Sequence, residues 1–335
     1  MREPAFWNRP SSLLSRLLAP AGTLYGAVAA RRMAQPGTQA GVPVICVGNY
    51  HVGGAGKTPT VLALAGILRT LGETPVVLSR GYGGRLEGPL QVDPQKHTAA
   101  DVGDEPLMMA KTLPVIVARQ RAAGLAPARA SGASIIVMDD GFQNPAVAKD
   151  VSLIVIDSDR GIGNGQVLPA GPLRAPLPPQ TARTDALVIV GGGIAANGVA
   201  AAVRAKGGLV LRAKLEPDEN AVAALRDKRV YAFAGIGDPQ RFFQSLRVCG
   251  IEVVRERAFA DHHPFSQDEV AELRAVAERD GLTLVTTEKD LARLRSTDGL
   301  AAFAQTVVPF AVTLIFDDEP ALRSFLTNRI VQARR

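Results

Sequence analysis

The chain has 335 residues, of which 47% are hydrophobic and 21% are charged, which excludes a disordered chain and suffices for one large domain or two ordinary ones. Lys and Arg total 38 against 32 for Asp and Glu, so the net charge is +6 and an anionic partner is favoured. No dense basic run with interleaved aromatic residues is present, which argues against nucleic acid as that partner.

The first predicted element is an apolar segment from Leu13 to Ala30 that is closed by Arg31 and Arg32. Arg16 and Pro20 interrupt this segment, which disfavours a membrane-spanning helix, and no secretory signal pattern precedes it. Four leucines form one apolar stripe on a helix: Leu13, Leu14, Leu17 and Leu18. Two interpretations stand, a helix docked on an anionic membrane surface and a helix packed on the protein's own core.

A phosphate-binding loop is the strongest motif in the chain. Residues 42–48 predict a buried strand and residues 58–71 a helix, and the turn between them has the sequence HVGGAGKT. Its residues are His51, Val52, Gly53, Gly54, Ala55, Gly56, Lys57 and Thr58. Lys57 is expected to reach the β- and γ-phosphates of ATP, and Thr58 to offer its hydroxyl to Mg²⁺. The strict pattern has glycine where His51 stands, so an incidental glycine-rich turn is the alternative.

The next strands continue a parallel sheet. Continuous Val, Ile and Leu runs indicate strands buried on both faces of a doubly wound α/β domain, over residues 74–79, 115–118, 134–140, 151–157 and 185–190. The run 134–140 ends in Asp139 and Asp140, where such sheets bind ligands, and one of the two carboxylates is expected to hold Mg²⁺. Residues 168–179 are rich in proline and predict an irregular surface loop.

A second, smaller α/β domain is predicted in the last third of the chain. Its strands are expected at 229–235, 252–256 and 281–290, the last running into a turn, and its helices at 238–250 and 266–279. A strand at 310–316 is expected to pair with 209–216 as a tie between the domains. The predicted organisation is a docking segment over 1–34, a P-loop kinase domain over 35–212, a linker over 213–228, the smaller domain over 229–308, and a return strand with a C-terminal helix over 309–335.

The motif details discriminate among enzymes with phosphate loops. A GTPase carries [NT]-K-x-D, whereas residues 287–290 read Thr-Glu-Lys-Asp. A partitioning-type ATPase carries a second lysine in the loop, where Val52 stands here. A kinase is therefore favoured, and the alternative is a nucleotide-switch ATPase that acts through a protein partner.

A kinase needs a group that positions or deprotonates the acceptor hydroxyl. The candidates are Asp104, in the string GDEP, and His262 or His263, in the string DHHP. Asp104 is equally explained as a cap before a helix, and the two histidines as part of a solvated loop.

Seven segments, in the same order, resemble the tetraacyldisaccharide 4'-kinase family: GNYHVGGAGKTP (48–59), SRGYGG (79–84), GDEP (103–106), DDGFQ (139–143), GNG with LPAGPLR (163–174), DHH (261–263) and TTEKDLARL (286–294). The resemblance covers nearly the whole chain. The N-terminal leucines, Tyr25, Arg31 and Arg32 also resemble the family's membrane-docking helix.

The resemblance implies transfer of the γ-phosphoryl group of ATP, with Mg²⁺, to the 4'-hydroxyl of tetraacyldisaccharide 1-phosphate, which forms lipid IVA. It implies Asp104 and His262 as the catalytic pair, Asp139 and Asp140 near metal and phosphate, and four substrate-binding residues, Arg80, Arg121, Gln143 and Arg174. Its partners would be the lipid A disaccharide 1-phosphate and an anionic membrane surface, with no obligate protein partner.

The implied location is peripheral, on the cytoplasmic face of the bacterial inner membrane. Cys46 and Cys249 form no zinc or disulfide pattern, as a reducing compartment predicts. Two positions depart from the family: Asn144 stands where the family usually has histidine, and Ala175 where it usually has glutamate. Both lie near the expected acceptor site.

Overall fold

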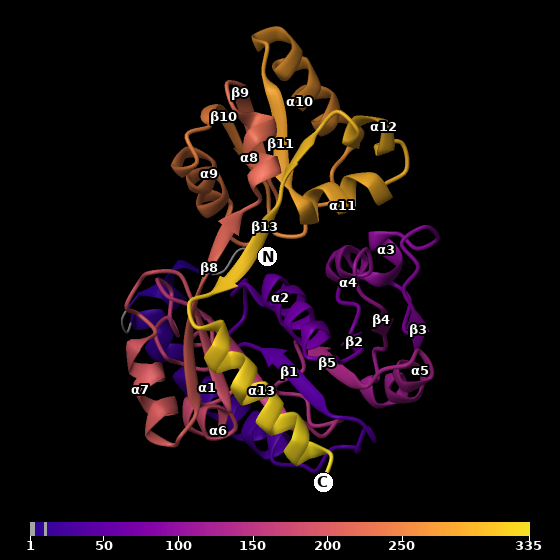
Figure 1. Cartoon of the computed structure of the whole chain (residues 1–335). Helices are drawn as coiled ribbons and strands as arrows, with labels where there is room; N and C mark the ends of the chain where they lie inside the picture. The colour runs from indigo at the N-terminus through magenta and orange to yellow at the C-terminus, as the bar shows by residue number, and fades with distance from the viewer. Residues whose placement is uncertain (1–3, 10–11) are drawn as a thin grey trace.

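The computed structural model describes residues 4–9 and 12–335, so positions 1–3 and 10–11 of the predicted docking segment lie outside the described residues. Within these ranges the strands form one nine-stranded and one four-stranded sheet. Figure 1 shows the smaller sheet with its helices above the larger one. The strands of the larger sheet are β1 (Val44–Gly48), β2 (Pro75–Ser79), β3 (Leu90–Gln91), β4 (Val115–Val117), β5 (Ile135–Asp139), β6 (Val151–Asp157), β7 (Ala186–Val190), β8 (Leu209–Pro217) and β13 (Val312–Phe316).

The larger sheet has the order β13-β8-β7-β6-β1-β5-β2-β4-β3. Its interior pairs are parallel, and the edge strands β3 and β13 run antiparallel to their neighbours. Alternate residues of β1 enter two different cores, Ile45 and Val47 on one face and Val44 and Cys46 on the other. This burial on both faces explains the unbroken apolar runs and confirms the predicted doubly wound α/β fold of the P-loop type.

Helices cover both faces of the larger sheet. α2, α4 and α13 supply side chains to one core, and α5 and α7 to the other. The helices around this sheet are α1 (Leu13–Met33), α2 (Lys57–Thr70), α3 (Ala99–Val102), α4 (Asp104–Met109), α5 (Leu125–Ala130), α6 (Leu177–Ala182), α7 (Asn197–Ala205) and α13 (Glu319–Ala333), with 3-10 turns at Ala5–Asn8 and Arg121–Gly124.

The smaller domain is also an α/β layer structure. Its parallel sheet has the order β10-β9-β11-β12, with cores on both faces. Its strands are β9 (Arg229–Ala234), β10 (Glu252–Ala258), β11 (Thr283–Thr287) and β12 (Val308–Phe310). Its helices are α8 (Glu219–Leu225), α9 (Pro239–Val248), α10 (Gln267–Asp280), α11 (Glu288–Ser296) and α12 (Ala301–Ala304).

β8 and β13 pair, as predicted; the structure shows that their pairing is antiparallel and that they carry the chain between the two sheets. Three local predictions need correction. The expected linker over 213–228 is regular structure, because β8 continues to Pro217 and α8 buries Leu225 in the smaller domain's core. The expected loop over 168–179 gives way to α6 at Leu177, since Pro178 is tolerated in a first helical turn. The expected turn after β11 is the start of α11, with Thr287 as its N-cap.

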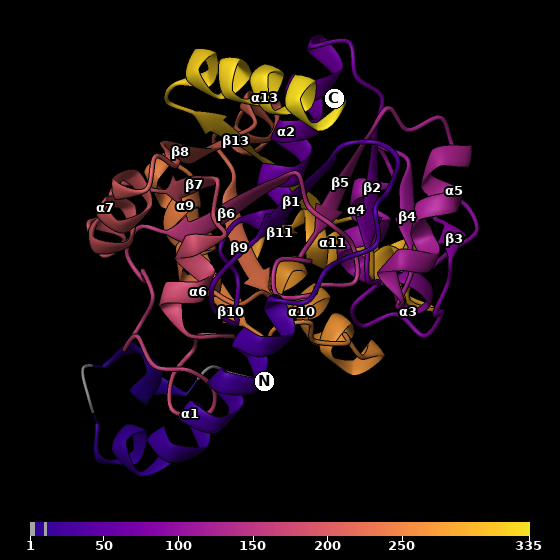
Figure 2. The ribbon, with the colours of Figure 1, turned by 90° about the horizontal axis from the view of Figure 1, so that it is seen from below.

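α1 projects from the rest of the molecule, as Figure 2 shows. Its buried positions are the small residues Ser15, Gly22 and Gly26, which contact the segment 167–176, and Met33 at its end. Most of its large apolar side chains are exposed: Leu13, Leu14, Leu17, Leu24, Tyr25 and Val28. Among the described residues it is the one helix that is long and apolar enough to cross a membrane, by length and composition.

Candidate active site

The phosphate loop joins β1 to α2 at the centre of the larger sheet. Gly53 and Gly56 have φ values of 105° and 86°, which glycine adopts without strain. A Cβ added to Gly54 would meet no described atom within 4 Å, so this part of the loop is open to a ligand. Lys57 and the buried Thr58 begin α2, whose unpaired N–H groups favour an anion. The strand, loop and helix therefore have the arrangement that phosphate binding requires.

His51 fills the position at which the strict motif has glycine. Its Nδ1 lies 2.9 Å from the carbonyl oxygen of Val52, and burial lowers the pKa of its imidazole to about 4. The ring is therefore neutral near pH 7, and Nδ1–H donates to that carbonyl. The backbone N–H of Val52 donates to the carbonyl of Pro172 at 2.9 Å, and His51 forms a β-bridge with Leu173. These contacts fasten the loop to the proline-rich segment.

The two carboxylates at the end of β5 have different partners. Asp140 Oδ1 accepts a hydrogen bond from Arg174 Nη1 at 2.7 Å and lies 3.8 Å from Lys57 Nζ. Burial opposes ionisation of Asp140, but these two cations outweigh it and lower its pKa. Asp139 Oδ2 accepts from Ser79 Oγ at 3.2 Å, whereas its buried Oδ1 has no hydrogen-bond partner within the described chain. Asp140 is thus neutralised in place, and Asp139 presents an oxygen without a partner.

Asp104 and His262 meet where the two domains face each other. Asp104 begins α4 and is 5% exposed, and its Oδ1 accepts from the backbone N–H of Glu105 at 3.0 Å. Its Oδ2 lies 3.0 Å from Nδ1 of His262, which follows β10 in the smaller domain. His262 has a φ of 56°, and its backbone N–H donates to the carbonyl of Gly235 at 3.0 Å. The structure thus brings together the two residues that the sequence predicted as a catalytic pair.

The charges of this pair support each other. The hydrogen bond that Nδ1–H of His262 donates to Asp104 raises the pKa of His262, although burial opposes its charge. Burial opposes ionisation of Asp104, but the hydrogen bond and charge of His262 and the charges of Lys289 and Arg293 lower its pKa to about 2. Asp104 is therefore ionised at neutral pH, with an imidazole proton held against it.

Arg293 of α11 fixes the turn that carries His262. Its Nη1 donates to the carbonyl of His263 at 3.0 Å, and its Nη2 to the carbonyl of Gly235 at 2.8 Å. The same Nη2 lies 2.7 Å from Oδ1 of the buried Asp290, and Nε lies 3.4 Å from Oδ2 of Asp104. One buried guanidinium thus binds the carbonyl of the residue after His262 and the carbonyl that accepts from the backbone N–H of His262.

Two further ion pairs cross between the domains. Lys289 of α11 pairs with Glu105 of α4, and Arg241 of α9 pairs with Asp157 at the end of β6. The sequence analysis named none of these four as site residues, and Lys289 entered it only within the string TTEKD. The partners are 184 and 84 residues apart in the chain, so no local pattern could have joined them.

The remaining predicted substrate residues differ in their exposure and in their hydrogen-bond partners. Arg80 follows β2 and is exposed. Arg121 is buried, and its Nη2 donates to the backbone carbonyls of both acidic residues at the end of β5, at 3.2 and 2.6 Å. Gln143 Nε2 donates to the carbonyl of Asn49 at 2.7 Å and to Gln180 Oε1 at 2.8 Å. Arg121 and Gln143 therefore hold the backbone around the phosphate loop.

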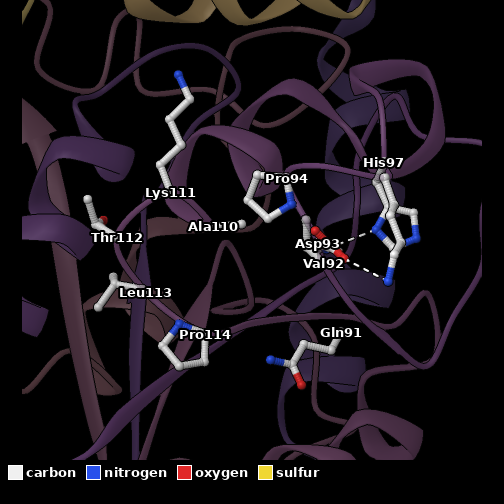
Figure 3. Close-up of a pocket in the computed structure, with 11 residues that line it drawn as sticks. Gln91, Val92, Asp93, Pro94, His97, Ala110, Lys111, Thr112, Leu113 and Pro114 are labelled. Atoms are coloured by element: carbon white, nitrogen blue, oxygen red, sulfur yellow. Dashed lines mark hydrogen bonds and ion pairs between the residues drawn. The ribbon is translucent and has the colours of Figure 1, made fainter.

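A pocket of about 710 Å³ lies elsewhere, between β3 and the segment that follows α4 (Figure 3). It contains none of the predicted site residues. Within it, Asp93 forms an ion pair with Lys96 at 3.1 Å, and the backbone N–H of Asp93 donates to Nδ1 of His97. The pocket is lined by Gln91, Val92, Asp93, Pro94, Lys96, His97, Ala110, Lys111, Thr112, Leu113 and Pro114. Neither the residues of the phosphate loop nor those of the two cross-domain ion pairs line this pocket.

Known proteins that are similar to this chain point to one family. The chain matches the model of the family "Tetraacyldisaccharide-1-P 4'-kinase" over residues 14–331. Relatives named tetraacyldisaccharide 4'-kinase are 78% identical over 335 residues in Nitrobacter hamburgensis, covering 100% of both chains, and 69% identical over 334 residues in Rhodopseudomonas palustris strain BisB18, covering 100% of this chain and 97% of the relative. A crystal structure of the "apo" form of LpxK from Aquifex aeolicus in complex with ATP has a TM-score of 0.72 and 26% identity, covering 95% of this chain and 100% of that one.

Proposed function

The chain belongs to the tetraacyldisaccharide-1-P 4'-kinase family, and from this premise we propose how its own side chains perform the reaction. It acts as an ATP-dependent kinase that transfers the γ-phosphoryl group to the 4'-hydroxyl of tetraacyldisaccharide 1-phosphate, forming lipid IVA in lipid A biosynthesis. The observation that carries this function is the match over nearly the whole chain, at 78% identity to a relative of that name.

ATP binds with its phosphates in the loop of residues 51–58. The backbone N–H groups of the loop and the N-terminus of α2 hold the phosphate oxygens, and the ammonium of Lys57 contacts the β- and γ-phosphates. Lys57 is already near this position, because its Nζ lies 3.8 Å from Asp140 Oδ1 at the edge of the loop. Arg174 compensates the same carboxylate, so Lys57 can turn to the nucleotide without leaving a buried charge unpaired.

Thr58 and Asp139 would hold Mg²⁺. No cluster of three or more His, Cys, Asp or Glu side chains in the described ranges forms a complete metal site, and Mg²⁺ commonly takes one or two carboxylates together with substrate phosphates. The unpartnered Oδ1 of Asp139 fits that requirement, whereas Asp140 is paired with Arg174. Bound there, Mg²⁺ would neutralise charge on the β- and γ-phosphates.

Asp104 and His262 act on the acceptor. A sugar hydroxyl is a weak nucleophile at neutral pH, and it needs a group that orients it and accepts its proton. The carboxylate of Asp104 serves this role, while His262 holds the carboxylate in place and shares a proton with it. The pair lies where the two domains meet, so an acceptor positioned there would contact both.

The acceptor's phosphate and sugar groups contact Arg80 and Arg174. Arg80 is exposed, and the side chain of Arg174 is 24% exposed next to Asp140. Arg121 is bound to backbone carbonyls at the end of β5, and Gln143 to the carbonyl of Asn49 before the phosphate loop. They therefore position the backbone of the site and do not contact the acceptor. This division of roles modifies the expectation that all four bind substrate directly.

Membership of a lipid A kinase family implies association with a membrane. α1 makes this contact from the cytoplasmic face of the bacterial inner membrane as a peripheral helix. Its exposed leucines enter the acyl region, and Arg31 and Arg32 in its last turn meet anionic headgroups. Leu13, Leu14, Leu17 and Leu24 of α1 are exposed and enter no core among the described residues, whereas Met33 at its end is buried in one.

The direct test is incubation with ATP labelled at the γ-phosphate and purified tetraacyldisaccharide 1-phosphate. Transfer of label to the disaccharide, dependent on Mg²⁺ and on both substrates, is expected. Hydrolysis of ATP without label in the lipid would instead indicate a nucleotide-switch ATPase and would reject the kinase function.

A further inference from the structure

The phosphate loop by itself supplies few cations to the transferring group. Val52 stands where partitioning-type ATPases carry a second loop lysine, and the guanidinium of Arg174 is paired with Asp140. Phosphoryl transfer spreads negative charge over three equatorial oxygens, and many enzymes of this class bring an additional cation from another segment. The smaller domain can supply a cation of this kind from the opposite side of the site.

Lys289 lies where the smaller domain contacts α4 of the larger domain. It is in the first turn of α11, which Figure 1 shows above α3 and α4. Its ammonium pairs with the carboxylate of Glu105 in the first turn of α4. The loop after β9 also reaches the site, because a Cβ added to Gly237 would lie 3.8 Å from the backbone nitrogen of Gly54.

Glu105 interacts with lysines from both domains. Burial opposes its ionisation, but the charge of Lys289, followed by that of Lys57, lowers its pKa. Burial likewise opposes the charge of Lys289, and the carboxylates of Glu105, Asp104 and Asp261 outweigh it and raise its pKa. Lys289 pairs with Glu105 directly, and Lys57 of the phosphate loop lies near enough for its charge to act on the same carboxylate.

Two other cations of the smaller domain that face the larger domain, Arg293 and Arg241, have fixed partners. The guanidinium of Arg293 is bound to Asp290 and to the backbone carbonyls of Gly235 and His263. Arg241 pairs with Asp157 at the end of β6. Lys289 has a flexible side chain that is 29% exposed, and a single carboxylate partner holds its ammonium.

We propose that Lys289 is a further catalytic residue, whose ammonium exchanges Glu105 for the γ-phosphoryl group of ATP during transfer. The proposal rests on the kinase activity proposed above. In the transfer, the bond between the γ-phosphorus and the bridging oxygen of ADP breaks, the bond to the 4'-oxygen forms, and the hydroxyl proton passes to Asp104. Lys289 forms no covalent bond and keeps its proton; it neutralises charge on the equatorial oxygens.

The test compares Lys289→Met and Lys289→Arg with Lys96→Met, a lysine of the remote pocket in Figure 3. We expect Lys289→Met to lower kcat by about 10³-fold or more, as removal of a comparable charged residue does, and Lys289→Arg to recover part of the loss. Affinity for ADP should stay within about twofold of wild type, whereas affinity for ADP with aluminium fluoride, a mimic of the transferring group, should fall with kcat. Lys96→Met should match wild type.

A second comparison separates this role from a merely structural ion pair. Lys289→Met leaves the carboxylate of Glu105 without its partner, so the double variant Glu105→Gln with Lys289→Met removes both charges together. We expect the double variant to have kcat at least about tenfold below that of Glu105→Gln alone. Equal kcat in these two variants, or parallel loss of ADP and ADP–aluminium fluoride binding in Lys289→Met, would overturn the proposal. An inactive wild type would instead reject the kinase function.

Discussion

Oδ2 of Asp104 lies 3.0 Å from Nδ1 of His262, although 158 positions separate the two residues in the chain. Asp104 starts a helix beside the larger sheet, and His262 lies in a turn of the smaller domain that Arg293 holds. The contact therefore exists only while the two domains face each other, so acceptor activation depends on their relative position.

The first prediction is that Asp104 and His262 act as one unit. Asp104→Ala should lower kcat by about 10²–10⁴-fold, the usual contribution of a positioned base, with ATP affinity nearly unchanged. His262→Ala should lose less, and the double variant should be little worse than Asp104→Ala, because residues that act together are not additive. His263→Ala is the control, since His263 pairs with Glu269 at 2.9 Å and should be milder. Fully additive losses, or a larger effect at His263, would contradict the pairing.

The second prediction concerns the pKa of His262, which should lie above its ordinary value of about 6.5 in the folded protein. A raised folded-state pKa means that the stabilisation by the pair is complete below about pH 6.5 and is lost as pH rises through the folded-state pKa. NMR titration of the imidazole should give a lower pKa in Asp104→Asn than in wild type. Urea unfolding at several pH values should show wild type losing its advantage over Asp104→Asn at alkaline pH. An unchanged His262 pKa in the variant would mean that the hydrogen bond does not persist in solution.

The third prediction is that Lys57→Ala lowers kcat by about 10²-fold or more, by analogy with the loss of one preorganised donor to developing charge. Asp140 would keep Arg174 as a partner, so the fold should survive the change. Steady-state kinetics with saturating ATP measure the effect, and circular dichroism checks the fold. Near-normal turnover would remove Lys57 from the mechanism.

The fourth prediction separates the two carboxylates that end β5. Asp139→Asn should raise the Mg²⁺ concentration needed for half-maximal activity, because the orphaned Oδ1 of Asp139 is the proposed ligand. Asp140→Asn should change the Mg²⁺ requirement less, since its main partners are Arg174 and Lys57. The control is Asp93→Asn in the remote pocket. A larger shift of the Mg²⁺ requirement in Asp140→Asn would reverse the assignment.

The fifth prediction concerns the membrane. Replacing Leu13, Leu17 and Leu24 by serine should reduce flotation with anionic vesicles without lowering the free energy of unfolding, because these side chains are 86%, 76% and 70% exposed. A control variant with serine at Ile194 and Val248, which are 76% and 80% exposed elsewhere, should float like wild type. Unfolding of the triple variant together with failure of the wild type to bind vesicles would instead show that α1 completes the protein's own core.

Apart from the short edge strand β3, the sequence predicted the strands of the larger sheet, the phosphate loop and the acidic end of β5. Each is local information: an unbroken apolar run, a glycine-rich turn before a helix, and carboxylates directly after a strand. The pairing of β8 with β13 was also readable, because both runs are apolar and lie at the two ends of the predicted smaller domain, but its antiparallel direction came from the structure. The start of α6 at Leu177 was not readable, since its prolines suit a loop and a first helical turn equally.

Only the tertiary structure decided which charges meet. Asp139 and Asp140 have the same side chain but different partners, because Arg174, 34 residues further along the chain, pairs with Asp140 alone. Lys289 belonged to a recognisable string, but its position opposite Glu105 depends on how the smaller domain sits over α4. Ion pairs of this kind form between surfaces that come together only after both domains have folded. No local sequence pattern therefore identifies the two partners.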